Sequence, residues 1–174
     1  MRVLFRSRPT GALRLLFRLP VHLYRLNLGW LLGHKFLLLI HRGRNSGRVY
    51  QTVLEVVRYN PATREIVVLS GWGERSDWYR NLKASPALEV GTGRQRYVPE
   101  QRFLAPEENH AVISDYARRH PLAFRFLARV FDYPLGGTEA ERRDFAESLR
   151  LVAFRPRPGQ LSPDEVAHTP HRRP

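Results

Sequence analysis

The chain has 174 residues and no cysteine, so disulfide bonds, thiolate metal sites and cysteine nucleophiles are excluded. Lysine and arginine outnumber aspartate and glutamate by 29 to 16, and only Lys35 and Lys83 are lysines. This length indicates one domain with an ordinary core, and the abundant arginine suits planar, bidentate binding of carboxylate or phosphate.

The positive charge is concentrated in the first third of the chain. Ten lysines and arginines precede Glu55, which is the first acidic residue. Such a skew is typical of a nucleic-acid-binding protein, a membrane-surface protein or an enzyme for an anionic ligand. Only the net charge favours nucleic acid, so we expect no nucleic-acid partner.

Residues 1–33 are predicted to form a basic, amphipathic helical segment. Basic groups recur there at spacings of four, four and three residues: Arg14, Arg18, His22 and Arg25. No window approaches the ~20 uncharged apolar residues that a membrane-spanning helix needs. The helix either lies in the plane of a membrane surface or packs on its own domain. The first interpretation predicts a cytoplasmic protein in peripheral contact with the inner face of the membrane through residues 1–32.

Residues 34–156 are predicted to form the folded domain, which begins with strands. The apolar run 35–41 is typical of a strand buried on both faces, and strands over 49–59 and 64–70 follow after turns. A short helix begins after a cap at Ser76 or Asp77 and ends at Lys83. A second hairpin turns around residues 91–93.

Helices dominate the later part of the domain. The pattern predicts a helix from about Pro106 to Arg119, another from Pro121, and a third that Thr138 and Glu141 begin with a capping box. A last strand follows, and residues 157–174, with four prolines, are predicted to be a disordered tail. Antiparallel hairpins without repeated strand–helix–strand crossovers favour an α+β fold around a small barrel.

The stretch HRGRNSGRVYQT, residues 41–52, places Arg42, Arg44 and Arg48 in a turn between two predicted strands. A hairpin turn requires glycine or asparagine, but it does not require arginine. Gly43 and Gly47 free the backbone to present N–H groups, so the turn is predicted to bind an anion. The alternative is that the arginines are solvated surface charge.

The stretch SGWGERSDWYRNL, residues 70–82, is a second candidate. Glycines flank Trp72 where a strand has just ended, which allows close approach of a flat ligand. Trp78 and Asn81 share one face of the short helix and suit a planar heterocycle with carbonyl and N–H edges. The alternative is that Trp78 and Tyr79 fill the core. The histidines show no metal-ligand spacing, and no nucleophile or general base is evident, so the pattern favours chemistry supplied by a bound cofactor.

The segments GRNSG and SGWGERSDWYRNLKASP resemble the motifs of the deazaflavin-dependent nitroreductase family, over about residues 33–156. The resemblance implies a split β-barrel like that of FMN-binding, pyridoxamine-phosphate-oxidase-like proteins, with an N-terminal amphipathic helix and peripheral helices added here. It also implies hydride transfer from reduced coenzyme F-420 to an electron-poor, hydrophobic quinone or nitro compound. Coenzyme F-420 is then the anionic redox cofactor, and FMN is the alternative.

The motif positions and their neighbours predict the residues that bind the cofactor. They are Arg42, Gly43, Arg44, Asn45, Ser46, Gly47, Arg48, Tyr50, Ser70, Gly71, Trp72, Gly73, Trp78, Asn81 and Lys83. Ser70 is also the predicted catalytic residue, near the point of hydride transfer.

Several positions depart from the family pattern. Asn45 and Gly71 replace lysines, Tyr50 replaces an arginine, and Val53 replaces a proline. Arg42 and Arg48 are expected to compensate for the lost cations. The loss of cationic contacts also leaves an alternative open, a non-catalytic split barrel that binds a flavin, haem or apolar ligand at the membrane surface.

Overall fold

A computed structural model describes residues 33–93, 95–130 and 137–157 of the chain. The predicted amphipathic helix with its membrane contact, and the predicted disordered tail apart from residue 157, lie outside these residues. Within the described ranges, no helix has the length and apolar character needed to cross a membrane.

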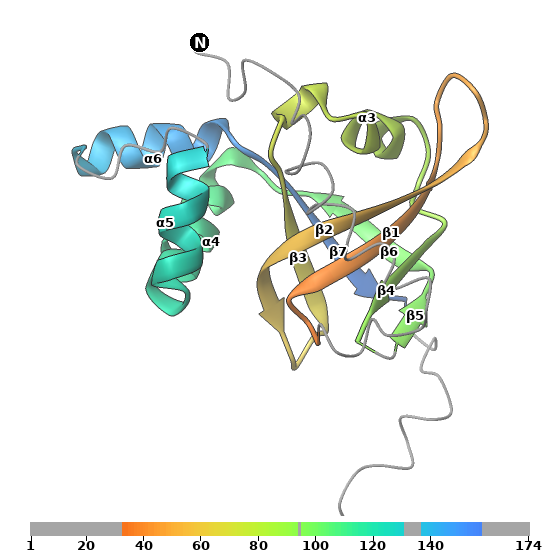
Figure 1. Cartoon of the computed structure of the whole chain (residues 1–174), viewed down its shortest axis with the longest axis horizontal. Coiled ribbons are helices and arrows are strands. Elements are labelled where there is room, and N and C mark those ends of the chain that lie inside the picture. The colour runs from red at the N-terminus through yellow and green to blue at the C-terminus, as the bar shows by residue number, and fades with distance from the viewer. Residues whose placement is uncertain (1–32, 94, 131–136, 158–174) are drawn as a thin grey trace, which may run out of the picture.

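One seven-stranded antiparallel sheet forms the centre of the fold (Figure 1). Its strands are β1 (Phe36–Arg42), β2 (Val49–Asn60), β3 (Glu65–Ser70), β4 (Glu89–Thr92), β5 (Gln95–Tyr97), β6 (Pro99–Phe103) and β7 (Arg150–Pro156). They are ordered β5-β4-β1-β2-β3-β7-β6. Only Val98 separates the two edge strands β5 and β6 along the chain, so the sheet curls into a small barrel. The predicted α+β split β-barrel is confirmed.

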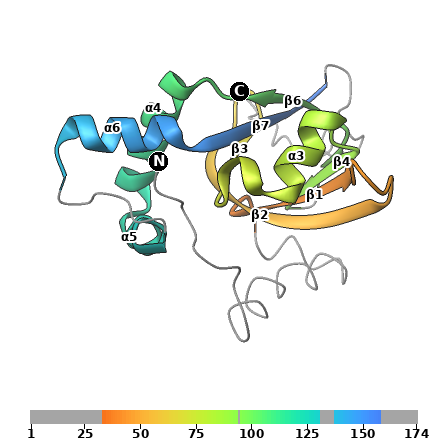
Figure 2. The ribbon, with the colours of Figure 1, turned by 90° about the horizontal axis from the view of Figure 1, so that it is seen from above.

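In the described ranges, four α-helices lie against or beside the barrel: α3 (Asp77–Ala84), α4 (Pro106–Arg119), α5 (Pro121–Val130) and α6 (Glu139–Ser148). A short 3-10 turn, η2 (Gly73–Arg75), precedes α3. Figure 2 shows α3 over one end of the barrel and the other three helices grouped beside it. The capping box predicted at Thr138 and Glu141 is present at the start of α6.

The sheet separates two apolar cores. The barrel interior holds residues from alternate strand positions, such as Leu37 and Phe154, and α3 closes it with Trp78, Tyr79 and Leu82. The second core lies between the sheet and helices α4 and α6: Val57, Val67, Val112, Ile113, Tyr116, Ala146, Leu149, Leu151 and Ala153. Burial of both faces fixes the register of the central strands, because a slip by one residue would exchange the two faces.

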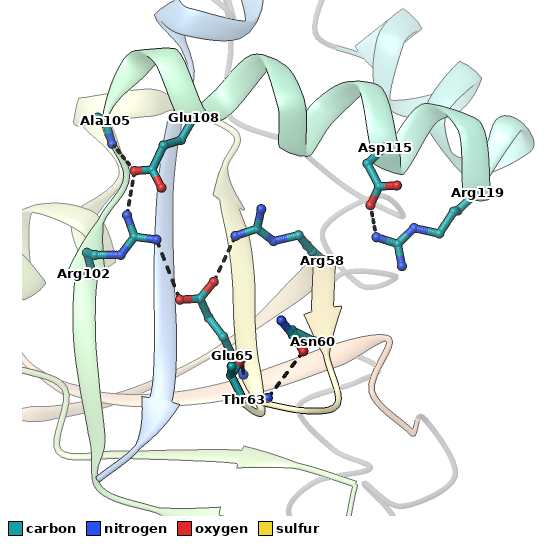
Figure 3. A network of polar contacts seen from close by, with 9 residues as sticks. All are labelled: Arg58, Asn60, Thr63, Glu65, Arg102, Ala105, Glu108, Asp115 and Arg119. Carbon is teal, nitrogen blue, oxygen red and sulfur yellow. Dashed lines mark hydrogen bonds and ion pairs between the residues drawn. The ribbon is translucent and has the colours of Figure 1, made fainter. Parts of the chain in front are cut away.

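A polar network, here called the barrel–helix network, joins the start of α4 to the sheet (Figure 3). The Glu65 carboxylate pairs with Arg58 at 2.9 Å and with Arg102 at 3.7 Å. Arg102 also pairs with Glu108 at 2.6 Å, and its hydrogen bond holds the pKa of Glu108 below its ordinary value. Glu108 accepts a further hydrogen bond from the Ala105 N–H at 3.1 Å. These contacts hold α4, and through it the second core, against the barrel.

Candidate functional site

A cavity of about 490 Å³ lies between the β1–β2 loop, the start of β2 and helix α3. It is lined by His41, Gly43, Arg44, Asn45, Ser46, Tyr50, Gln51, Thr52, Trp72, Ser76, Asp77, Trp78 and Asn81. The volume falls within the ~300–1,000 Å³ that is typical of small-molecule sites. Both stretches singled out in the sequence, 41–52 and 70–82, therefore face one cavity.

The β1–β2 loop is a short turn, and hydrogen bonds at its base hold it closed. The N–H of Gly43 donates to the carbonyl of Arg48 at 2.8 Å, and Gly47 adopts a φ of 66°, which glycine tolerates without strain. The Arg42 guanidinium donates to the Gly47 carbonyl at 2.9 Å. Arg42 therefore braces the turn itself.

Gly43 lies against an aromatic side chain at the cavity wall. A Cβ at this position would be 2.6 Å from Tyr50 Cε2 and 2.8 Å from Ser46 Oγ. The Tyr50 hydroxyl is 3.2 Å from the same Ser46 oxygen, and the Tyr50 ring stacks on His41 with a centroid separation of 6.0 Å. Glycine is thus required for the tyrosine to occupy this part of the wall.

Arg44 ties the loop to α3. Its backbone N–H and its Nη1 each donate to Asn81 Oδ1 at 3.1 Å, and Nη1 also pairs with Asp77 Oδ1 at 3.2 Å. The Arg44 side chain is 27% exposed, whereas that of Asp77 is 69% exposed. An arginine held by one neutral partner and one solvated carboxylate keeps positive charge available to an anion at the cavity mouth.

Asn81 continues this contact into the protein. Its Nδ2 lies 3.1 Å from His41 Nδ1, and His41 Nε2 lies 3.2 Å from Thr52 Oγ1. His41 and Asn81 are both buried, and burial is the main cause that lowers the pKa of His41 from its ordinary 6.5. Arg44, Asn81, His41 and Thr52 are called the cavity network below.

Trp72 and Trp78 supply the apolar side of the cavity. Trp78 is buried in the barrel core, as one interpretation predicts, and it also lines the cavity. Tyr79 points away from the cavity, with its ring edge against Phe103 and the Lys83 amine 5.5 Å from its centroid. The predicted shared face of Trp78 and Asn81 is therefore the face that borders the cavity.

Ser70 lies behind the cavity wall. It is fully buried, and its Oγ is 2.8 Å from the Gly73 carbonyl and 2.7 Å from Ser76 Oγ. A hydroxyl has a single proton, so Ser70 donates to only one of these two oxygens at a time, and donation to Ser76 leaves the proton of Ser76 free. Ser76 lines the cavity, and Ser70 supports it from behind.

The structure brings eight of the predicted cofactor-binding residues to the cavity: Gly43, Arg44, Asn45, Ser46, Tyr50, Trp72, Trp78 and Asn81. Arg42, Gly47, Arg48, Ser70, Gly71, Gly73 and Lys83 are not among its lining residues. The Lys83 amine instead lies over the Tyr79 and Phe103 rings.

Sequence reasoning did not identify five of the lining residues: His41, Gln51, Thr52, Ser76 and Asp77. The sequence pattern indicates Ser76 and Asp77 only as candidate helix caps. His41 lies in β1 and Thr52 in the paired strand β2. In the sequence, the only feature that points to His41 is that it is a polar residue at the end of an apolar run.

Two solved structures and one family model are similar to this chain. A solved structure of an F420-H2 dependent reductase (FDR-A) matches with 18% identity and a TM-score of 0.46, over 69% of this chain and 93% of that one. A pyridoxamine 5'-phosphate oxidase-related, FMN-binding protein from Nostoc punctiforme matches with 14% identity and a TM-score of 0.44, over 84% of this chain and 81% of that one. Among curated proteins, none matches the chain.

The family described as F420H(2)-dependent quinone reductase matches residues 16–121, which is more than half of the chain. The resemblance to deazaflavin-dependent enzymes, and the choice of coenzyme F-420 as cofactor, are thereby confirmed. The chain belongs to this family and is a deazaflavin-dependent oxidoreductase.

Proposed function

We propose that this protein transfers hydride from reduced coenzyme F-420 to a hydrophobic, electron-poor acceptor, in the first place a quinone and in the second a nitro compound. The observation that carries the proposal is the position of Arg44. Its guanidinium is held at the mouth of a cavity that Trp72 and Trp78 line on the apolar side. A positive group beside aromatic surface suits a ligand with an anionic part and a flat ring.

The residues around the cavity fit the chemistry of the coenzyme. Arg44 and the Ser46 hydroxyl are donors for its anionic part, and Trp78 offers ring surface beside the amide of Asn81. The bound, reduced coenzyme supplies the hydride. The protein therefore has to bind the coenzyme and the acceptor, orient them toward each other and exclude water. Buried Trp78 and the barrel core beneath it provide the dry side of the site.

Four hydroxyl-bearing residues line the cavity and are candidates for the proton that accompanies hydride transfer: Ser46, Tyr50, Thr52 and Ser76. We place this role on Ser76, with Ser70 acting through it. The 2.7 Å contact between the two oxygens orients the Ser76 hydroxyl. Reduction of a quinone to a hydroquinone requires one hydride and one proton, so one donor at the acceptor oxygen suffices.

Arg48 is proposed to compensate for the family cations that Asn45 and Tyr50 replace. Its side chain makes no hydrogen bond or ion pair with the described part of the chain, and residue 48 is exposed. The guanidinium is therefore free to follow the anionic tail of the coenzyme outside the cavity. Arg42, which donates to Gly47, contributes by holding the turn.

Fluorescence titration of the purified protein with coenzyme F-420 tests binding, and loss of the reduced coenzyme on addition of a soluble naphthoquinone or a nitroaromatic compound tests turnover. We expect saturable binding that Arg44→Ala weakens at least about tenfold, since a hydrogen bond to a charged group contributes about 1.5–3 kcal/mol. Arg96→Ala is the matched control, because Arg96 pairs with Glu89 on the surface and does not line the cavity. Absence of saturable binding would refute the proposal.

The alternative is a protein that binds its ligand without turnover. One observation favours it, since Ser70, the predicted catalytic residue, does not line the cavity. This alternative predicts saturable binding and no consumption of reduced coenzyme with any quinone. The two functions are separated by the turnover measurement alone.

Contact with a membrane through residues 1–32 is proposed as the route by which a lipid-soluble quinone reaches the cavity. The support is the spacing of Arg14, Arg18, His22 and Arg25 along one side of a predicted helix. Sedimentation with vesicles that contain anionic lipid, compared between the full chain and a chain lacking residues 1–32, tests the proposal. Equal sedimentation of the two chains would contradict it.

A further inference from the structure

The cavity network runs from the surface loop to a buried histidine. Asn81 Oδ1 accepts from both the backbone N–H and the Nη1 of Arg44. The amide oxygen therefore faces the loop, and the Asn81 NH₂ group faces His41 Nδ1 at 3.1 Å. An NH₂ group can only donate, so Nδ1 has to be the unprotonated, accepting nitrogen.

This arrangement selects one form of His41. With Nδ1 accepting, the proton of the neutral ring is on Nε2, which donates to Thr52 Oγ1 at 3.2 Å. A doubly protonated ring would place an N–H against the Asn81 NH₂ group, two donors with no acceptor between them. The Asn81 contact is therefore compatible with neutral His41 only.

The surroundings of His41 favour the same form. His41 as a residue is 3% exposed, and burial lowers its pKa, opposed by smaller contributions from a backbone hydrogen bond of Arg42 and from the Asp77 carboxylate. The charged and titratable groups around it are Arg42 on its own strand, Arg44 in the loop, Asp77 on α3 and the Tyr50 ring on β2. The network cannot deliver protons through Nδ1, because the amide of Asn81 is not an acid at these pH values.

We propose that His41 is a positioning residue, whose neutral ring fixes the Asn81 amide and thereby holds the Arg44 loop in its anion-binding shape. Protonation of His41 releases the loop. The inference rests on the proposed function in one respect, that the Arg44 loop contacts the anionic part of the cofactor. The coupling between His41 and Arg44 is a property of the ligand-free protein and is open to a separate test.

Amide hydrogen exchange of the full, ligand-free chain measures this coupling. The reporter is the Arg44 N–H, which donates to Asn81, and the internal reference is a core strand amide such as that of Val67. In the wild type we expect the protection factor of the Arg44 amide to fall as the pH is lowered from 7.5 to 5, while the protection factor of the Val67 amide does not change. The sign follows from the ring, because the neutral form that accepts from Asn81 is lost as the pH falls through the lowered pKa of His41.

Two substitutions separate positioning from mere packing. His41→Phe keeps a ring but removes the acceptor, and we expect roughly tenfold or greater loss of Arg44 protection at every pH, because a buried donor is left unpaired. His41→Asn places an acceptor oxygen near the position of Nδ1 and does not titrate. It is expected to restore protection and to abolish the pH dependence. An Arg44 protection factor that is independent of pH in the wild type and unchanged in His41→Phe would overturn the proposal.

Titration with coenzyme F-420 connects the network to binding. We expect the dissociation constant of the wild type to rise as the pH falls through the lowered pKa of His41, that of His41→Asn to stay flat, and that of His41→Phe to be raised throughout. Exchange that behaves as described with no coenzyme binding at any pH would support the role of His41 and refute the proposed function. Saturable coenzyme binding, together with Arg44 exchange that depends neither on pH nor on the His41 substitutions, would support the proposed function and refute the role of His41.

Discussion

Two arginine networks in this protein have similar charge but different surroundings. The barrel–helix network pairs Arg58 and Arg102 with the carboxylates of Glu65 and Glu108, so that its charges balance internally. The cavity network instead holds Arg44 mainly through the neutral amide of Asn81, beside open space. An arginine is therefore available to a ligand when a neutral group, rather than a carboxylate, carries most of its hydrogen bonds.

The largest effect is expected from Asn81→Leu, which keeps the approximate size of the side chain and removes its polar atoms. Two donations from Arg44 and the contact with His41 are lost at once. We expect roughly 100-fold weaker coenzyme binding, because unpaired buried groups cost about 1–3 kcal/mol each. Fluorescence titration measures the affinity. Unchanged affinity in a folded variant would show that the cavity network does not shape the site.

Gly43→Ala tests the wall beside the loop. The added Cβ would lie 2.6 Å from the Tyr50 ring, so the ring has to move away from His41. Because the tyrosine is 45% exposed, it can move at little cost to stability. We expect about tenfold weaker binding, with less than about 1 kcal/mol change in the free energy of unfolding. Titration and urea denaturation of one preparation give both numbers, and a large loss of stability would contradict this account.

Glu65→Gln tests the other network. The substitution removes the shared partner of Arg58 and Arg102, whose side chains are 29% and 48% exposed. Partly exposed ion pairs contribute little, so we expect the free energy of unfolding to fall by about 1 kcal/mol and the coenzyme affinity to remain unchanged. Urea denaturation measures the first quantity. A change in affinity would mean that the two networks are coupled, so that the surroundings of Arg44 depend on Glu65.

The smallest effect, and the only gain, is expected from Asp77→Asn. Its carboxylate is 3.2 Å from Arg44 and competes with an anionic ligand for the guanidinium. Because the side chain is 69% exposed, we expect binding only about threefold tighter. The loss of an acidic group from the first turn of α3 should lower stability by about 0.5 kcal/mol. Weaker binding in this variant would indicate that Asp77 itself contacts the ligand.

The fold was largely predictable from sequence, because local patterns determine it. The apolar run 35–41, the capping box at Thr138 and the Pro106 helix start each depend on neighbours within a few positions. The strand limits after the hairpin at residues 91–93 could not be predicted as well. The chain there forms two separate strands, β5 and β6, on either side of Val98. Pro99 has no N–H to donate, which is consistent with a break at this point.

The site was only half predictable. The shared face of Trp78 and Asn81 follows from helical spacing, and the structure confirms it at the cavity. The different positions of Arg42 and Arg44 depend on where α3 crosses the loop, and the local sequence does not contain that information. For the same reason the sequence did not single out His41, since its partners lie 11 and 40 residues away.

The corner at Val98 has a consequence for how this barrel tolerates cleavage. A single residue there joins β5 and β6, the strands at opposite edges of the sheet order. Cleavage of the chain at Val98 would disconnect β5 from β6. Each of these short edge strands has backbone groups on its outer side that face no strand in the sheet order. Such a nicked protein would then be prone to recruit strands from neighbouring molecules, so the integrity of one peptide link helps to keep this protein from self-association.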